Sequence, residues 1–224
     1  MTGATNSDAD DAAIAAMVGH WPHDTVVVSG PDAATYLHSQ LSQDLRPLAV
    51  GAEVWSFVLQ PTGRIDALVL VRRTAEESFE LRVDLGFGEA LVARLNRFRI
   101  RVKAEVSMTG SQAGDPAAFH IARVAAGWPA LAAEITEASI PAEFPGVVAR
   151  AVSFTKGCYP GQELVERMDS RAAQAPRHLE RIDVGTGAAV GDPVVRDGVE
   201  VGVITSVAVV DGVPRALALV RRGS

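Results

Sequence analysis

The sequence predicts an α+β body followed by a small C-terminal antiparallel β-barrel. Two observations carry this prediction. Segments with a period of two alternate with segments of helical spacing through residues 20–110. Nearer the C-terminus, Asp197-Gly198 and Asp211-Gly212 each stand between β-forming valines, which is the strongest short-range hairpin signal. A mixed body and an all-β module follow from these two textures.

The first part of the body is predicted as strand, turn, helix and hairpin. Residues 25–29 are a β-branched run, and residues 33–45 carry apolar side chains at helical intervals after a Gly-Pro-Asp turn. Within residues 53–59, Val54, Ser56 and Val58 alternate with Trp55, Phe57 and Leu59, and the tight turn of residues 61–64 leads into a second run at residues 65–72. A β-hairpin is the simple interpretation.

Three further elements are predicted before the middle of the chain. Residues 79–83 are a strand candidate, and residues 88–98 have the apolar spacing of an amphipathic helix. From residue 97 to residue 106 the period changes to two. This predicts a strand whose outer face is formed by Arg97, Arg99, Arg101 and Lys103. Such a face would attract an anionic ligand, for example a polyglutamate tail or an RNA phosphate; a solvated sheet face is the alternative.

A cluster of turn residues at 109–116 predicts an internal boundary near residues 107–118. Beyond it, residues 119–126 are a strand candidate, and the chain is expected to stay extended through residues 134–145. The predicted organisation is a disordered leader, an α+β body and a β-barrel module, at residues 1–19, 20–170 and 178–224.

Composition narrows the class of protein. The 224 residues are 48% apolar and 21% charged, which is typical of a folded globular chain. The leader is acidic where a signal peptide would be basic, and charged residues interrupt every apolar run before it reaches membrane-spanning length. A net charge of −6 argues against nucleic acid as a direct partner. The only cysteine is Cys158, so no intramolecular disulfide forms and a reducing, cytoplasmic location is expected.

The most unusual segment surrounds that cysteine. Two glycines and Pro160 predict an irregular backbone that presents the thiol of Cys158. Lys156, and a helix beginning near Gly161, would both favour the thiolate. The alternative is that a lone cysteine is a small buried apolar residue. The candidate functional segment consists of Lys156, Gly157, Cys158, Tyr159, Gly161, Gln162 and Glu163.

Other chemistry-bearing residues give weaker signals. Glu163 and Glu166 are three residues apart and would share a helix face as a carboxylate pair, although surface charge is the commoner explanation. The five histidines show no metal-ligand spacing, and no metal site is predicted. A pairing of Cys158 with a histidine for nucleophilic catalysis stays open, because such partners are adjacent only in space.

The segment Lys156-Gly157-Cys158-Tyr159-Pro160-Gly161-Gln162-Glu163 resembles the signature K-G-C-[YF]-x-G-Q-E of YgfZ-type folate-binding proteins, which belong to the superfamily of GcvT-like aminomethyltransferases. Further stretches resemble the same superfamily in the same order, and together they cover nearly the whole chain after the leader. These are residues 30–44, 59–64, 123–129, 140–143 and 201–206.

The resemblance implies two α+β portions and a C-terminal barrel arranged as a ring around a central folate-binding opening. It implies tetrahydrofolate or a derivative as the ligand, and a non-catalytic role in the assembly or repair of iron–sulfur proteins, including tRNA modification enzymes that carry clusters. Iron–sulfur enzymes or assembly factors are then the implied partners. The resemblance assigns activity to the thiol of Cys158 and gives the remaining signature positions as its motif. The chain is shorter than the family near residues 107–116 and in the barrel.

Two other functions are compatible with these residues. One is a folate-dependent aminomethyltransferase or demethylase, like the catalytic relatives. The other is an interaction module that has lost the ligand, which the shortened loops would allow.

Overall fold

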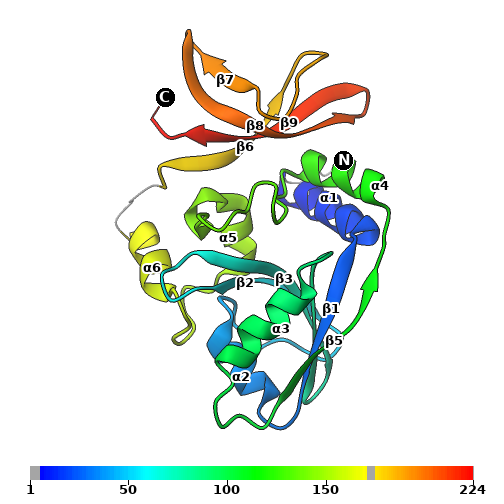
Figure 1. The fold of residues 1–224 in the computed structure, drawn as a ribbon, viewed down its shortest axis with the longest axis vertical. Helices are drawn as coiled ribbons and strands as arrows, with labels where there is room; N and C mark the ends of the chain where they lie inside the picture. Colours follow the sequence, from blue (N-terminus) through cyan, green and yellow to red (C-terminus); the bar gives the residue numbers. More distant parts are fainter. Residues whose placement is uncertain (1–5, 171–174, 224) are drawn as a thin grey trace, which may run out of the picture.

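The computed structural model describes residues 6–170 and 175–223. They form a mixed body on a five-stranded antiparallel sheet and a four-stranded antiparallel sheet that stands beyond helix α5 (Figure 1). The α+β class predicted from the sequence is confirmed. The elements of the body are α1 (Asn6–His20), β1 (His23–Ser29), α2 (Ala33–Gln40), β2 (Glu53–Leu59), β3 (Ile65–Ala75), β4 (Ser78–Asp84), α3 (Gly88–Arg97), β5 (Glu105–Gln112), α4 (Pro116–Ala126), the 3-10 turn η1 (Pro141–Glu143), α5 (Pro145–Ala151) and α6 (Gln162–Ser170).

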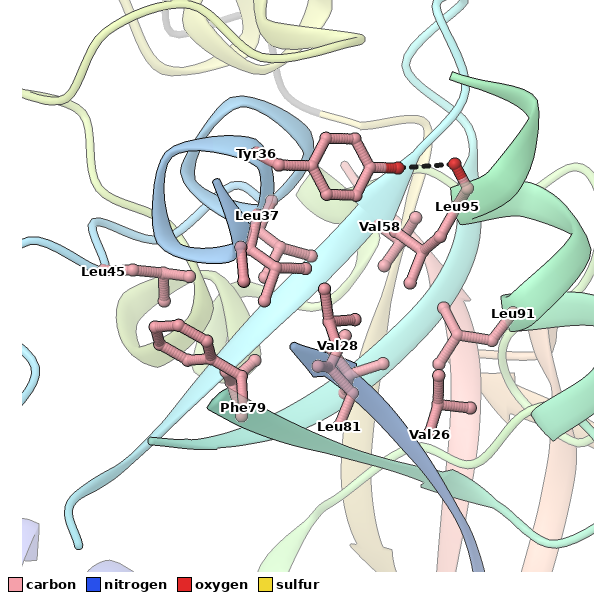
Figure 2. Packing of buried hydrophobic residues seen from close by; sticks show 14 of the residues in the cluster. Val26, Val28, Tyr36, Leu37, Leu45, Val58, Phe79, Leu81, Leu91 and Leu95 are labelled. Carbon is pink, nitrogen blue, oxygen red and sulfur yellow. Dashed lines mark hydrogen bonds between the residues drawn. The ribbon is translucent and has the colours of Figure 1, made fainter. Parts of the chain in front are cut away.

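The body sheet has the order β2-β3-β4-β1-β5, and α2 and α3 cover one of its faces. Burial alternates along β1, so Val26 and Val28 point into this core. Figure 2 shows them packed with leucines from α2, β4 and α3. The hydroxyl of Tyr36 on α2 donates to the carbonyl of Leu95 on α3 at 2.5 Å, which joins the two helices. The strands predicted at residues 25–29, 53–59, 65–72 and 79–83 are confirmed, and so is the helix predicted at residues 88–98. The helix predicted at residues 33–45 is also present, but it ends at Gln40.

The opposite face of β2 and β3 carries a second core, and β2 is therefore buried from Trp55 to Leu59 and β3 from Ala67 to Val71. Met17 on α1 and Val147 on α5 pack here, together with the tryptophans Trp21, Trp55 and Trp128. The ring of Trp55 lies 5.4 Å from that of Trp21 and 4.7 Å from that of Trp128, between centroids. Aromatic contacts of this kind stabilise cores beyond their buried area.

The C-terminal sheet consists of β6 (Arg177–Asp183), β7 (Pro193–Arg196), β8 (Val199–Val210) and β9 (Val213–Arg221) in the order β6-β9-β8-β7. The predicted Asp-Gly hairpins join β7 to β8 and β8 to β9. An ion pair at 2.5 Å between Arg196 on β7 and Glu180 on β6 brings the two edge strands together, so the sheet is curled. No β6–β7 backbone pairing is found among the described residues, and closure into a barrel remains a prediction.

Two predicted segments have a different structure. Residues 6–19 of the expected disordered leader belong to α1, whose Met17 is 1% exposed; residues 1–5 lie outside the described part. Residues 119–126 belong to the helix α4, not to a strand. The Asp115 carboxylate caps this helix by accepting from the backbone N–H groups of Ala117 and Ala118, and Gly127 ends it in the left-handed conformation at φ 68°. These local caps outweigh the β propensity of the segment.

The predicted basic strand at residues 97–106 is also wrong. Helix α3 continues to Arg97, and β5 begins only at Glu105. Between them Arg99 folds back, with Nε on the side-chain oxygen of Asn96 at 2.9 Å and Nη1 on the carbonyl of Ala104 at 2.6 Å. The turn-like residues at 109–112 lie inside β5, which pairs with β1. Because β5 is an edge strand of the sheet, its polar side chains stay exposed to solvent.

Candidate functional site

The signature segment is anchored by the buried side chain of Lys156. Its ammonium group donates to the carbonyls of His38, Leu41 and Gln43, the last at 3.3 Å, where the chain leaves α2. It also lies 5.0 Å from the centroid of the Tyr159 ring. Burial lowers the pKa of Lys156 to about 8, and the charge of Asp44 opposes that shift. Lys156 therefore fastens the loop to the body instead of facing solvent.

Gly161 allows the same loop to lie against the β2–β3 hairpin. Its φ is +80°, and a Cβ at this position would stand 2.6 Å from the carbonyl oxygen of Gln60 and 2.9 Å from the Cα of Gly63. Only glycine fits such a contact at low cost. The Gly157 backbone has no positive φ, and a Cβ there would meet nothing within 4 Å. Close packing therefore explains why residue 161 is a glycine, but it does not explain why residue 157 is one.

Cys158 lies between these anchors and is exposed. Tyr159, which follows it, is 7% exposed and belongs to the core beneath the loop; burial raises the pKa of its hydroxyl to about 12. The loop thus presents a thiol on a rigid base, as the sequence predicts. The alternative of a buried structural cysteine is wrong.

The end of the signature starts helix α6. The side-chain oxygen of Gln162 accepts from the backbone N–H of Tyr159 at 3.3 Å, and its amide donates to Glu166 at 2.5 Å. Glu163 points outward and pairs with Arg167 at 3.4 Å. Since each carboxylate has its own partner, Glu163 and Glu166 do not form a carboxylate pair.

Sequence reasoning missed a polar group beside the loop. His38 Nδ1 lies 3.4 Å from Oδ1 of Asp44, and Arg46 Nη2 donates to Oδ2 of the same carboxylate at 2.5 Å. Hydrogen bonds from Arg46 hold the pKa of Asp44 well below its usual range, and burial followed by the charge of Lys156 lowers the pKa of His38. The stretch containing His38 and Asp44 carried part of the family resemblance, which was the available signal.

The four basic residues do not form one face. Arg97 ends α3, Arg99 is bonded to the backbone, Arg101 has φ 58° in the following loop, and the backbone N–H of Lys103 donates to Asp32 at 2.7 Å. Among the described residues, no cluster of three or more His, Cys, Asp or Glu side chains is arranged to hold a metal ion. No described helix has the length and apolar character needed to span a membrane.

A pocket of about 460 Å³, here called the α5 pocket, opens beside helix α5. Its walls include the aromatic rings of Trp128 and Phe144, with Gly146 and Arg150 on α5 and Leu179 on β6. It therefore lies where the body meets the C-terminal sheet (Figure 1). From α5 the chain leads directly to the signature loop, and the N–H of Ser153 donates to the carbonyl of Ser42 at 3.0 Å on the way.

The space enclosed by the tryptophan core is nearly filled. A cavity of about 10 Å³ remains between Trp21, Trp55 and Trp128, enough for one water molecule at most. Asp84 borders it and accepts from Trp21 Nε1 at 2.6 Å and from the backbone N–H of Leu131 at 2.7 Å. A folate-sized opening does not pass between these three rings.

No protein-family model matches the chain. A Haemophilus influenzae protein described as uncharacterized is 25% identical over 186 residues, and the match spans 66% of each chain. The crystal structure of glycine cleavage system aminomethyltransferase T from Bartonella henselae has a TM-score of 0.71 to this structure at 16% identity, covering 93% of this chain and 81% of that one. The chain therefore has the GcvT-like fold of that aminomethyltransferase.

Proposed function

We propose that this chain binds tetrahydrofolate or a derivative in the α5 pocket and acts as an accessory protein for iron–sulfur proteins through Cys158. The observation that carries the proposal is a ligand-sized, mainly apolar pocket beside helix α5, from which the chain leads directly into the loop that presents the thiol. The GcvT-like fold and the signature residues support the same ligand.

The pocket fits a folate in size and in chemistry. Its volume of about 460 Å³ lies within the range of roughly 300–1,000 Å³ typical of small-molecule sites. Ile14, Pro145 and Leu179 line the pocket and offer accessible apolar surface to the flat rings of a folate. Arg150 lies at the same wall and is the lining residue that suits a glutamate-tail carboxylate, although it also pairs with Asp11. The four basic residues proposed from the sequence do not line this pocket.

Cys158 supplies the second half of the proposal. One thiol per chain does not complete the usual set of four cluster ligands, so the thiol acts toward a partner that brings its own cysteines. Exposure of Cys158 on an anchored loop suits such a contact, since the loop needs no rearrangement to present it. Iron–sulfur enzymes or their assembly factors are the proposed partners.

A calorimetric titration with 5-formyltetrahydrofolate, a stable surrogate for tetrahydrofolate, tests the ligand. Saturable one-to-one binding is expected, and Arg150→Met should weaken it about tenfold by removing a charge-assisted hydrogen bond. Gly146→Leu should block the pocket, because Gly146 lines it. The substitution should not disturb folding, because a Cβ at this position meets no other atom within 4 Å. Gly19→Leu is the matched control, a helical glycine with equally open surroundings outside the pocket. Absence of binding, or binding that ignores both pocket variants, would reject the α5 pocket.

The accessory role has a separate test. Cells that carry Cys158→Ala should lose iron–sulfur enzyme activity while the purified variant still binds the folate. Full enzyme activity in those cells would reject the role of the thiol and leave the ligand intact.

The GcvT-like fold favours aminomethyl transfer as a second candidate function. Purified protein would then transfer a one-carbon unit to tetrahydrofolate from a methylated amine or a glycine-derived donor. Transfer that survives Cys158→Ala would make this second candidate the better description.

A further inference from the structure

The segment between α3 and β5, residues 98–104, has no role in the proposed function. We call it the α3–β5 loop, and it lies at the end of the body away from the C-terminal sheet (Figure 1). Ile100 in this loop is 76% exposed, the largest exposed fraction among the large apolar residues in the described part of the chain. A single exposed apolar residue is common on protein surfaces, so the neighbours of Ile100 decide what it means.

Three cations next to Ile100 in the sequence have no anionic partner within the described residues. They are Arg97, Arg101 and Lys103, and all three are exposed. They do not form the face of a strand, but they lie on one short segment that ends α3 and crosses to β5. Glu105, the nearest acidic residue along the chain, pairs with none of them. The segment is therefore a basic surface on a chain whose net charge is −6.

The α3–β5 loop has a fixed shape before any partner binds. Arg99 folds back across it, and its Nη1 donates to the carbonyl of Ala104 at 2.6 Å. The backbone N–H of Lys103 donates to the Asp32 carboxylate at 2.7 Å, and the carbonyl of Lys103 accepts from the N–H of Asp32 at 3.2 Å. Between these contacts Arg101 has φ 58°, a left-handed conformation that residues with a Cβ seldom adopt. A loop held in this way loses less conformational entropy when it binds.

We infer that the α3–β5 loop docks an acidic protein segment. Ile100 packs against an apolar side chain of that segment, and the three cations face its aspartates and glutamates. The net charge of −6 repels an acidic protein on average, so attraction at this one basic surface also fixes the orientation of docking.

A protein segment fits this surface better than nucleic acid does. The phosphate backbone offers no apolar surface to Ile100, and the net charge of the chain opposes binding to a polyanion that is charged along its whole length. The inference does not rest on folate binding, because no residue of the α3–β5 loop lines the α5 pocket.

The first test is photo-crosslinking in cells that express the full chain with p-benzoyl-L-phenylalanine at position 100. The same group at position 50 is the control, because Val50 is 59% exposed and has no charged residue within two positions. An adduct is expected from position 100 and not from position 50. Mass spectrometry of the adduct should place the crosslink in a protein segment where an apolar residue stands among aspartates and glutamates.

The second test is calorimetry with that partner in purified form. Ile100→Ser should weaken binding at least about tenfold, because the isoleucine loses its buried contact. The double variant Arg101→Met with Lys103→Met should weaken it about tenfold at low salt and reduce the loss of affinity as salt is added. Val50→Ser and Arg72→Met, at exposed positions outside the loop, are the matched controls. Binding of 5-formyltetrahydrofolate by Ile100→Ser should equal that of the wild type, which separates this surface from the proposed ligand site.

Four outcomes would overturn the inference. The first is no adduct from position 100 above the level seen from position 50. The second is an adduct to nucleic acid or to lipid, and the third is a captured protein segment without acidic residues. The fourth is binding of the purified partner that Ile100→Ser leaves unchanged.

Discussion

At the scale of single residues, Lys156 is the group whose acidity the fold changes in a testable way. Its pKa falls from 10.5 to about 8, so between these values the unfolded chain binds the proton that the folded chain has released. Stability contributed by this group therefore rises with pH over that window. Relative to Lys156→Met, the wild-type free energy of unfolding should increase by about 3 kcal/mol from pH 8 to pH 10.5.

Chemical denaturation of both proteins across that range measures this difference. Lys103→Met is the control, because Lys103 is exposed and should leave the pH dependence unchanged. Tyrosine titrations are common to all three proteins and cancel in the comparison. Parallel curves for wild type and Lys156→Met would contradict the buried, easily deprotonated lysine.

The two signature glycines, Gly157 and Gly161, are expected to differ in how much an alanine substitution lowers stability. Gly161→Ala forces a Cβ to 2.6 Å from the Gln60 carbonyl at a φ of +80°, and should cost at least about 2 kcal/mol of stability. Gly157→Ala should change stability by less than about 0.5 kcal/mol. Thermal unfolding of both variants and of the wild type measures these two changes in stability. If Gly157→Ala is stable yet inactive in cells, the space above Gly157 is needed for a partner and not for folding.

Features of single residues could be predicted from the sequence where they depend on neighbouring residues in the chain. The irregular backbone around Cys158 and its exposure were predicted from Gly157, Pro160 and Gly161, and the structure has both. The buried position of Lys156 was not predicted, because its three carbonyl partners lie more than 110 residues away in the chain. Local spacing does not reveal contacts of that range.

At the scale of elements, a buried polar network joins α4 to β8. Arg123 Nη1 donates to Glu134 at 2.9 Å and Nη2 donates to the Ser206 hydroxyl at 2.6 Å, while Ser206 donates to Glu134 at 2.6 Å. Arg123→Met leaves the Glu134 carboxylate buried without its cation, and should cost about 3–5 kcal/mol. Adding Glu134→Gln removes the unpaired charge and should restore part of that loss.

Urea denaturation of the two single variants and the double variant forms a cycle that measures the coupling. Arg101→Met, in an exposed loop, is a surface control. Additive losses in the cycle would mean that Arg123 and Glu134 do not act as a pair.

The elements also show where sequence patterns fail. The strand–turn–helix start was predicted because the periodicity of β1 matches its alternating burial. The β2–β3 hairpin was predicted from its turn at residues 61–64, although β2 is buried on both faces from Trp55 to Leu59 and does not alternate. Residues 119–126 were predicted as a strand, although Asp115, Pro116 and Gly127 are ordinary start and stop signals of the helix α4 that they form. The alternation from Arg97 to Val106 does not reflect a single strand, since Arg97 ends a helix, residues 98–104 form a loop, and only Glu105 and Val106 belong to β5.

At the scale of the whole molecule, the two sheets share core residues. Leu179 and Leu219 of the C-terminal sheet pack into the tryptophan core, and Val124 of α4 packs with Leu217 of β9. The resemblance led to an expected ring around an opening, but the space between the three tryptophans is filled by their side chains. No pattern in the sequence predicts that filling, because it depends on how distant elements meet.

Shared cores predict that the body and the C-terminal sheet unfold together. All three tryptophans lie in the body, so their fluorescence reports on the tryptophan core, whereas far-ultraviolet circular dichroism reports on both sheets. The two probes should give coincident denaturation curves. Leu217→Ala, at a fully buried position of β9, should lower both midpoints equally by removing about 2–5 kcal/mol. Val195→Ala, at a position 56% exposed on β7, should leave both almost unchanged. If Leu217→Ala shifts the circular dichroism curve but not the fluorescence curve, the C-terminal sheet is an independent unit, and a site at its junction with the body would open without unfolding the body.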